Sequence, residues 1–210
     1  GGKINNTGLV EVPMGTTLRT VIEEIGGGIP NGKKFKAAQT GGPSGGCIPM
    51  EHYDIEIDYD NLIAIGSMMG SGGMVVMDET SCMVSIAKFY LEFTCEESCG
   101  KCSPCRIGNK RMLEILDKIT KGQGTMEDLE TLKNLAGVIK DTALRGLRQT
   151  SPNPILSTIT NFWDEYVEHV KDKKCRAGAC KSLMQYVIDP EQCVGCTSCA
   201  RNCPVNAIQG

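Results

Sequence analysis

The sequence predicts an α+β fold made of consecutive segments: a small mixed module, a helical region and a cysteine-rich tail. Short apolar runs bounded by turn residues lie near the start, and a 3.6-residue apolar repeat begins at about residue 82. Twelve cysteines fall in groups along a chain of 210 residues, which is long enough for more than one core. We expect the modules at 1–57, 82–172 and 173–210, with 58–81 as a connector.

The mixed module is expected to begin with a hairpin. Residues 3–5 and 9–12 are strand candidates joined across Asn6-Thr7-Gly8, which is a turn signal. Thr16 or Thr17 can then cap a helix that ends at the glycines 26–28. This helix carries Leu18, Val21, Ile22 and Ile25 on one face.

Two glycine-rich stretches flank the remaining strands. Residues 35–39 are predicted to form a strand, and the stretch 41–46 follows it. We interpret 41–46 as a turn and not as a phosphate loop, because no P-loop lysine follows. The stretch 70–73 is interpreted in the same way, ahead of a strand at 74–77. Cys47 is predicted to be a buried small apolar residue.

Four helices joined by short loops are expected in the helical region, as in a small bundle. The first covers 83–93, and the third begins at Thr125, with Asp128 completing a capping box. The fourth spans 152–172. The inner side of the second carries Met112, Ile115, Leu116 and Ile119, and that of the fourth carries Ile155, Ile159, Phe162, Trp163, Tyr166 and Val170.

The tail contains the run Cys193-x2-Cys196-x2-Cys199-x3-Cys203-Pro204. Bacterial-type ferredoxins use this spacing to bind a [4Fe–4S] cluster. Zinc also takes paired thiolates, but usually as two separated pairs. We therefore assign Cys193, Cys196 and Cys199 to one cluster and Cys203 to a second, in a partial bacterial-ferredoxin fold. Such clusters predict single-electron transfer.

A second group, Cys99-x2-Cys102-x2-Cys105, lies between the first two helices. Cys105-Arg106 opens the second helix, where free N–H groups stabilise anionic sulfur. Three thiolates leave one iron of a four-iron cluster without a protein ligand. A fourth ligand must therefore come from elsewhere.

Composition excludes several other classes of protein. Cysteines at ligand spacing favour metal binding in a reducing compartment over a secreted disulfide framework. The net charge of −3 gives no support for nucleic-acid binding. No apolar run approaches the ~18 residues that cross a bilayer. We expect a cytoplasmic protein without direct membrane insertion, and, because the chain opens at Gly1, a fragment cut at both ends.

Two segments carry a resemblance to a known family. Glu97-Ser-Cys-Gly-Lys-Cys-Ser-Pro-Cys-Arg-Ile-Gly108 and Gln149-Thr-Ser-Pro-Asn-Pro154 resemble the NADH-binding flavin subunit of respiratory complex I. The sequence is most similar to the ferredoxin-extended version in NAD(P)-coupled, electron-bifurcating iron hydrogenases. The resemblance implies that 1–57 is a truncated ubiquitin-like β-grasp (SLBB-like) module and 82–172 a four-helix iron–sulfur bundle.

The resemblance also implies cofactors and partners. FMN and NAD(P) would bind a domain preceding Gly1, so no catalytic residue and no flavin or nicotinamide site is expected in this chain. The implied partners are other iron–sulfur subunits of a multi-subunit complex, namely a thioredoxin-like [2Fe–2S] subunit and a hydrogenase or dehydrogenase catalytic subunit.

One position departs from the family pattern. The family has Leu-Cys-Gly-Leu-Gly before Gln149, with that cysteine as the fourth cluster ligand, whereas this chain has Leu-Arg145-Gly-Leu-Arg. Arginine is a permanent cation and a very poor iron ligand. We hypothesise that Cys95, four residues before Cys99, substitutes for it. The alternatives are a labile or three-iron cluster, a damaged or misread codon, and an ordinary thiol at Cys95.

The remaining metal-capable groups are His169, Cys175 and Cys180, with Cys82 as the candidate fourth. Imidazole and thiolates suit a structural zinc site, which the resemblance to hydrogenase subunits also implies. The alternative is a solvated histidine at a charged helix end.

The function that the sequence predicts is electron relay in an NAD(P)H-linked flavin oxidoreductase. The alternatives are a stand-alone ferredoxin-like electron carrier and a zinc-stapled structural subunit. The sequence leaves open NAD or NADP, and a hydrogenase, complex I or formate-dehydrogenase partner.

Overall fold

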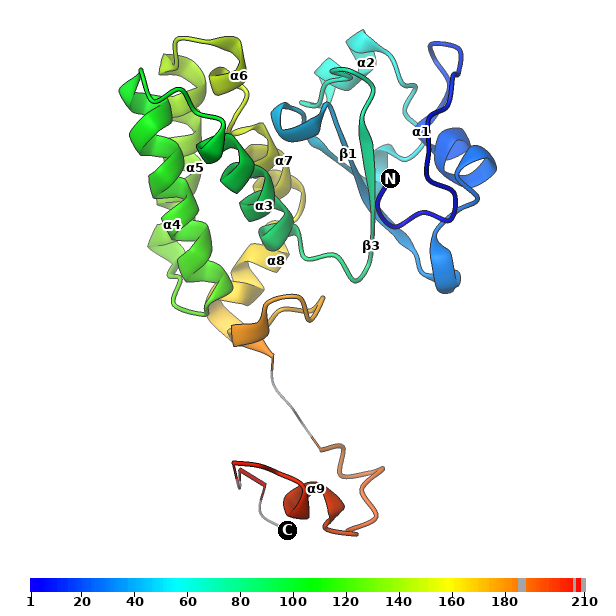
Figure 1. The fold of residues 1–210 in the computed structure, drawn as a ribbon, viewed down its shortest axis with the longest axis vertical. Helices are drawn as coiled ribbons and strands as arrows, with labels where there is room; N and C mark the ends of the chain where they lie inside the picture. The colour runs from blue at the N-terminus through cyan, green and yellow to red at the C-terminus, as the bar shows by residue number, and fades with distance from the viewer. Residues whose placement is uncertain (185–187, 206, 209–210) are drawn as a thin grey trace.

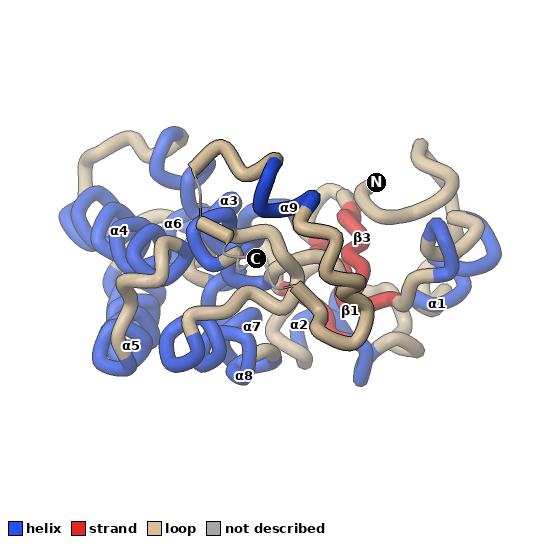
Figure 2. The backbone as a smooth tube through the Cα atoms, turned by 90° about the horizontal axis from the view of Figure 1, so that it is seen from below, coloured by secondary structure: helices blue, strands red, loops and turns tan. Residues whose placement is uncertain are grey.

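The computed structural model describes residues 1–184, 188–205 and 207–208. Within them, a small antiparallel sheet lies beside a group of helices (Figure 1), and Figure 2 shows the same arrangement from below. The strands are β1 (Phe35–Thr40), β2 (Cys47–Pro49) and β3 (Met74–Asp78). The helices are α1 (Leu18–Thr20), α2 (Tyr59–Ala64), α3 (Met83–Glu96), α4 (Asn109–Thr120), α5 (Met126–Thr142), α6 (Gly146–Gln149), α7 (Asn153–Asn161), α8 (Trp163–Val167) and α9 (Ser198–Arg201).

The sheet has the strand order β2-β1-β3 and is antiparallel throughout. The predicted strands at 35–39 and 74–77 are confirmed as β1 and β3. Residues 58–81, expected as a connector, supply both α2 and β3, so this stretch contributes to the core of the sheet. That core consists of Leu18, Ile22, Phe35, Ala38, Ile48, Tyr53, Leu62 and Val76.

The predicted helix after Thr17 is confirmed, but Ile25, which was expected on its apolar face, is 38% exposed. The Thr17 side chain accepts a hydrogen bond from the Thr20 N–H at 3.2 Å, which caps α1. A π turn, Val21–Ile25, continues the helix to Gly26, so that Leu18 and Ile22 face the sheet core.

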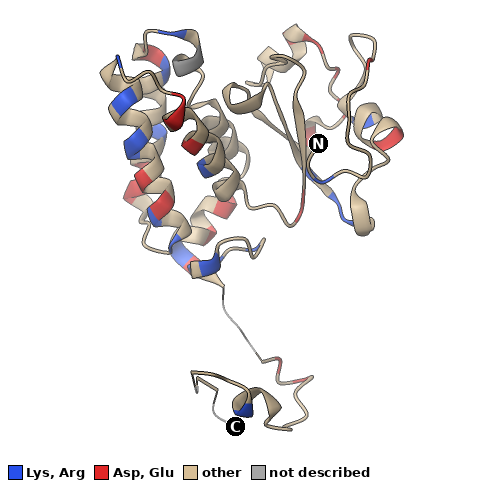
Figure 3. Cartoon of the chain, in the orientation of Figure 1, with Lys and Arg blue, Asp and Glu red and all other residues tan. Residues whose placement is uncertain are grey.

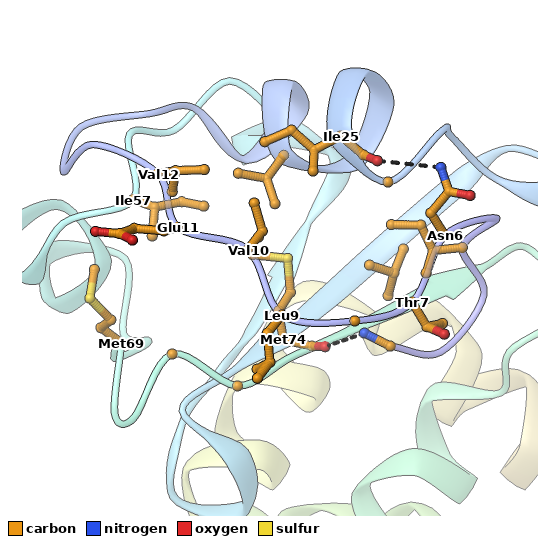
Figure 4. Close-up of a pocket in the computed structure, with 18 of the residues that line it drawn as sticks. Asn6, Thr7, Leu9, Val10, Glu11, Val12, Ile25, Ile57, Met69 and Met74 are labelled. Carbon is orange, nitrogen blue, oxygen red and sulfur yellow. Dashed lines mark hydrogen bonds between the residues drawn. The ribbon is translucent and has the colours of Figure 1, made fainter.

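The expected hairpin at 3–12 is wrong, because neither segment forms a strand in the structure. Gly2 instead bridges in parallel to Val76, and the Lys3 N–H donates to the Val76 carbonyl at 2.8 Å. The following residues line an apolar cavity of about 650 Å³ and leave Leu9 exposed (Figure 4). An alternating apolar segment becomes a strand only beside another strand, and the described residues offer none here.

The helical region packs around one continuous core. Helix α3 contacts α4 and α7, while α5 contacts both α4 and α7. The predicted capping box of α5 is confirmed, because Thr125 and Asp128 exchange side-chain and backbone hydrogen bonds. Basic and acidic side chains are intermixed along these helices (Figure 3). The largest buried side chains of this core are Leu91, Met112, Leu116, Ile119, Leu129 and Tyr166.

The single helix expected at 152–172 is wrong. Phe162, with φ −129° and ψ 38°, breaks it into α7 and α8, and the π turn Glu168–Asp172 follows α8. The break shifts the helical register, so Trp163 is 41% exposed instead of facing inward. Tyr166 and Val170 are buried as predicted, and His169 is fully buried.

A third apolar cluster joins the sheet to the helices. It contains Ala37, Cys47, Met77 and Met83, with Phe162 packed against them. The predicted burial of Cys47 is confirmed, and burial raises the pKa of its thiol to about 12. The sheet and the helices therefore share one tightly packed boundary.

Candidate metal centres

The first candidate centre is the loop between α3 and α4. Cys102 and Cys105 are buried there, whereas Cys99 is exposed. A π turn, Pro104–Gly108, contains Cys105 and runs directly into α4, as the sequence predicted for the start of this helix. Free N–H groups at this helical start favour a negatively charged sulfur.

Two polar side chains approach the Cys105 sulfur. The Asn109 Nδ2 atom donates to it at 3.4 Å, and the Ser98 Oγ atom lies 3.3 Å away. The buried Asn109 is held in turn by Ser151, whose hydroxyl donates to its Oδ1 atom at 3.2 Å. Hydrogen bonds to sulfur and burial are two of the features that set the reduction potential of an iron–sulfur cluster. Sequence reasoning missed Asn109, although its position four residues after Cys105 in a helix was a usable signal.

Cys95 shares a small cavity with Cys105. This cavity, of about 160 Å³, is lined by Cys95, Ser98, Gly100, Cys105, Arg106 and Lys110. Burial raises the pKa of the Cys95 thiol to about 11, and the neighbouring Cys105 adds to the effect. The last turn of α3 therefore brings a fourth sulfur to the side of the loop on which Cys105 lies.

Arg145 stands at the position where a fourth ligand was expected. It is the extended residue before α6, and its side chain is exposed. A guanidinium group has no lone pair to offer to iron. Position 145 therefore does not fit a cluster ligand, whereas Cys99, Cys102 and Cys105 offer three thiol groups in the loop between α3 and α4.

The second candidate centre gathers four buried residues, namely Cys82, His169, Cys175 and Cys180. Their ligand atoms all lie within 4.8 Å of one another. The His169 Nε2 atom is 3.3 Å from the Cys82 sulfur and 3.4 Å from the Cys180 sulfur. The structure thus brings together the four residues that the sequence named as zinc candidates.

The chain brings these four residues from separate segments. Cys82 immediately precedes α3, His169 lies in the π turn after α8, and Cys175 and Cys180 lie in the connector to the tail. The Nδ1 atom of His169 is 2.7 Å from the Glu165 carbonyl oxygen, which fixes a proton on Nδ1 and leaves Nε2 for the sulfurs. Three thiolates and one imidazole form a common donor set of structural zinc sites.

Burial and the hydrogen bonds with Cys82 shift the pKa values of His169 and Cys180. Burial opposes a charge on His169, but the hydrogen bond and charge of Cys82 outweigh it and raise the pKa to about 9. The hydrogen bond with Cys82 lowers the pKa of Cys180. A divalent cation would stabilise the deprotonated sulfurs that this arrangement needs.

The cysteines of the tail form a separate group. Cys193, Cys196 and Cys199 are exposed, and Cys203 is partly buried. Cys199 lies on α9, the short helix that follows the loop bearing Cys193 and Cys196. The backbone N–H of Ala207 donates to the Cys203 sulfur at 3.3 Å. Residues 185–187, 206, 209 and 210, which belong to the expected connector and ferredoxin segment at 173–210, lie outside the described residues.

No helix in the described part of the chain has both the length and the apolar character that a membrane crossing requires.

Comparison with known protein families agrees with this arrangement of cysteines. Residues 85–169 match the NADH-ubiquinone oxidoreductase-F iron-sulfur binding region, residues 186–209 a 4Fe-4S binding domain, and residues 1–48 an SLBB domain. The chain therefore contains an iron–sulfur binding region similar to that of the NADH-ubiquinone oxidoreductase-F proteins, and the predicted resemblance is confirmed.

The chain is also similar to individual curated proteins and to solved structures. The chain is 63% identical to the NADP-reducing hydrogenase subunit HndC of Solidesulfovibrio fructosivorans, over 100% of this chain and 43% of that protein. It is 38% identical to the F 2 subunit of the NADH-quinone oxidoreductase of Rhizobium meliloti, over 83% of this chain and 41% of that protein. It thus spans less than half the length of these curated relatives. Among solved structures, the chain is similar to an NAD+-reducing [NiFe]-hydrogenase in the H2-reduced state, with 26% sequence identity and a TM-score of 0.71. The match covers 81% of this chain and 28% of the hydrogenase chain.

Proposed function

We propose that this chain is the iron–sulfur relay portion of an NAD(P)H-linked flavin oxidoreductase. The match of residues 85–169 to an oxidoreductase-F iron–sulfur region carries the proposal, and the buried cysteine loop between α3 and α4 lies within that match. A [4Fe–4S] cluster supplies single-electron transfer when bound. The chain itself supplies thiolates, hydrogen bonds to sulfur and burial.

In the helical region, Cys99, Cys102 and Cys105 would hold one cluster. We assign Cys95 as the fourth ligand, because it lines the same cavity as Cys105 while Arg145 is exposed and cationic. Four thiolates are the usual ligand set of such a cluster. This assignment makes the chain independent of the cysteine that its family places at position 145.

In the tail, Cys193, Cys196 and Cys199 would hold a second cluster, with Cys203 directed to a third. The match of residues 186–209 to a 4Fe-4S binding domain supports this assignment. Cys193, Cys196 and Cys199 are exposed, in contrast to Cys102 and Cys105. An exposed cluster would suit electron exchange with another iron–sulfur subunit.

We further propose that Cys82, His169, Cys175 and Cys180 bind zinc. Because these residues come from the segment between β3 and α3, the turn after α8 and the connector, a bound ion would hold these three segments together. Zinc has no redox chemistry of its own, so the role would be structural. FMN and NAD(P) would bind elsewhere in a longer protein, and the partners would be a thioredoxin-like [2Fe–2S] subunit and a hydrogenase or dehydrogenase catalytic subunit.

The division into modules follows from these roles. We propose a β-grasp module that takes in β3 as well as residues 1–57, because β3 pairs with β1. The helical iron–sulfur region would span 82–172, and 173–210 would form the connector and the first half of a ferredoxin-like domain.

Metal analysis after anaerobic reconstitution tests this function. The relay proposal predicts iron and acid-labile sulfide together with zinc, and EPR signals of [4Fe–4S] clusters on reduction with dithionite. A colourless protein that binds zinc and no iron would overturn the proposal and favour the zinc-stapled structural subunit.

A further inference from the structure

Glu165 is a buried carboxylate that touches three parts of the molecule. It lies on α8 and is 2% exposed. Its Oε1 atom is 2.5 Å from the Lys36 ammonium on β1, and its Oε2 atom accepts a hydrogen bond from the Met83 N–H at 3.2 Å. Its backbone carbonyl accepts the Nδ1 proton of His169 at 2.7 Å.

The contact with Met83 holds the start of α3. Met83 is the first residue of that helix, and the preceding Cys82 caps it without a side-chain hydrogen bond. The first N–H groups of a helix need acceptors, and a negative charge there is favourable. The Glu165 carboxylate supplies both, so it fixes the backbone next to the Cys82 sulfur.

The backbone of the same residue orients a second candidate ligand. With Nδ1 of His169 committed to the Glu165 carbonyl, Nε2 points at the sulfurs of Cys82 and Cys180. A metal-binding histidine commonly donates its other N–H in this way. Glu165 therefore positions Cys82 through its side chain and His169 through its backbone.

Lys36, on β1, forms an ion pair with the buried Glu165 carboxylate and so connects α8 to the sheet. Its side chain is 13% exposed, and its ammonium also donates to the Ser81 carbonyl at 2.6 Å. Ser81 immediately precedes Cys82. A buried carboxylate without its cationic partner is strongly unfavourable, so the two charges belong together.

We propose that Glu165, neutralised by Lys36, is a positioning residue that sets the metal affinity of the Cys82–His169–Cys175–Cys180 site and links that site to the sheet. This inference rests on the proposed zinc site. Removing a group that hydrogen-bonds directly to a metal ligand typically changes metal affinity about 10–100-fold. The Glu165 carboxylate acts one step further out, through the Met83 N–H, so its removal should cost about 10-fold, at the low end of that range. Sequence reasoning missed Glu165, although its position four residues before His169 was a usable signal.

The test measures Zn2+ and Co2+ affinity by chelator competition on the full chain, with circular dichroism to confirm folding. Glu165→Ala removes the acceptor for the Met83 N–H and is expected to weaken binding about 10-fold. Glu165→Gln keeps an acceptor oxygen and should recover part of that loss. Glu114→Gln, which removes an exposed ion pair with Arg111 on α4, is the matched control and should bind as the unmodified chain does.

The outcomes separate the inference from the site on which it rests. If Glu165→Ala unfolds, the metal affinities of Glu165→Gln and Lys36→Met are compared with that of the Glu114→Gln control. The inference then requires both variants to bind the metal more weakly than the control. Unchanged affinity in the folded Glu165 and Lys36 variants would overturn the inference. An unmodified chain that shows no cobalt–thiolate absorption would overturn the zinc site and the inference with it, while its iron and sulfide content would still report separately on the relay function.

Discussion

Asn109 should raise the reduction potential of the cluster in the helical region. Its Nδ2 atom is 3.4 Å from the Cys105 sulfur, it is 1% exposed, and Ser151 holds its other end. An N–H that points at sulfur stabilises the reduced cluster more than the oxidised one, because the reduced cluster carries an additional negative charge. Asn109→Leu keeps the number and branching of the side-chain heavy atoms and removes this donor.

The size of the effect follows from the hydrogen bond. Hydrogen bonds to charged groups contribute about 1.5–3 kcal/mol, and we take about 1 kcal/mol as the part that differs between the two oxidation states. For one electron this corresponds to about 40 mV. We therefore expect the midpoint potential of Asn109→Leu to be about 40 mV more negative.

An EPR-monitored redox titration measures this shift. Asn134→Leu, a substitution of the same type at an exposed position on α5, is the control and should leave the potential unchanged. A potential for Asn109→Leu that equals that of the control, or that lies above it, would refute the role of the hydrogen bond.

Three further predictions concern stability. A Cβ atom at Gly45 would lie 1.7 Å from the Thr40 carbonyl oxygen, so Gly45→Ala should lower the free energy of unfolding, measured in urea, by about 3 kcal/mol. Gly73→Ala meets nothing within 4 Å and should change stability by less than about 0.5 kcal/mol; equal losses would contradict the packing argument. Thr125→Ala removes the cap of α5 and should lower the free energy of unfolding by about 1 kcal/mol, whereas no change would show that the cap is dispensable. Zinc at 1,000 times its Kd should stabilise the chain by about 4 kcal/mol over the chelated form with unchanged iron content, and equal thermal midpoints would argue against a structural ion.

Local signals predicted the parts of the fold that local chemistry decides. The cap at Thr125 and the apolar repeat of α4 each depend on neighbours within a few residues, and each is confirmed. The match of residues 85–169 agrees with the region that the cysteine spacing between α3 and α4 had indicated.

The sequence failed where distant contacts decide. The apolar residues of 152–172 keep a helical spacing across Phe162, so no local pattern predicted the break between α7 and α8. The segment 9–12 alternates like a strand but has no neighbouring strand to pair with in the described structure. The buried pair of Lys36 and Glu165 joins residues far apart in the sequence, which no local pattern could have brought together.

The ligand set of the helical cluster is the central claim, and iron and sulfide quantitation with EPR tests it most directly. The background is a chain whose four tail cysteines, at positions 193, 196, 199 and 203, are replaced by serine. We predict that this chain holds one [4Fe–4S] cluster, that Cys95→Ser converts it to a [3Fe–4S] form or loses it, and that adding Arg145→Cys restores it. A Cys95→Ser variant with undiminished iron, sulfide and EPR signal, or a parent chain that binds no iron, would contradict the account.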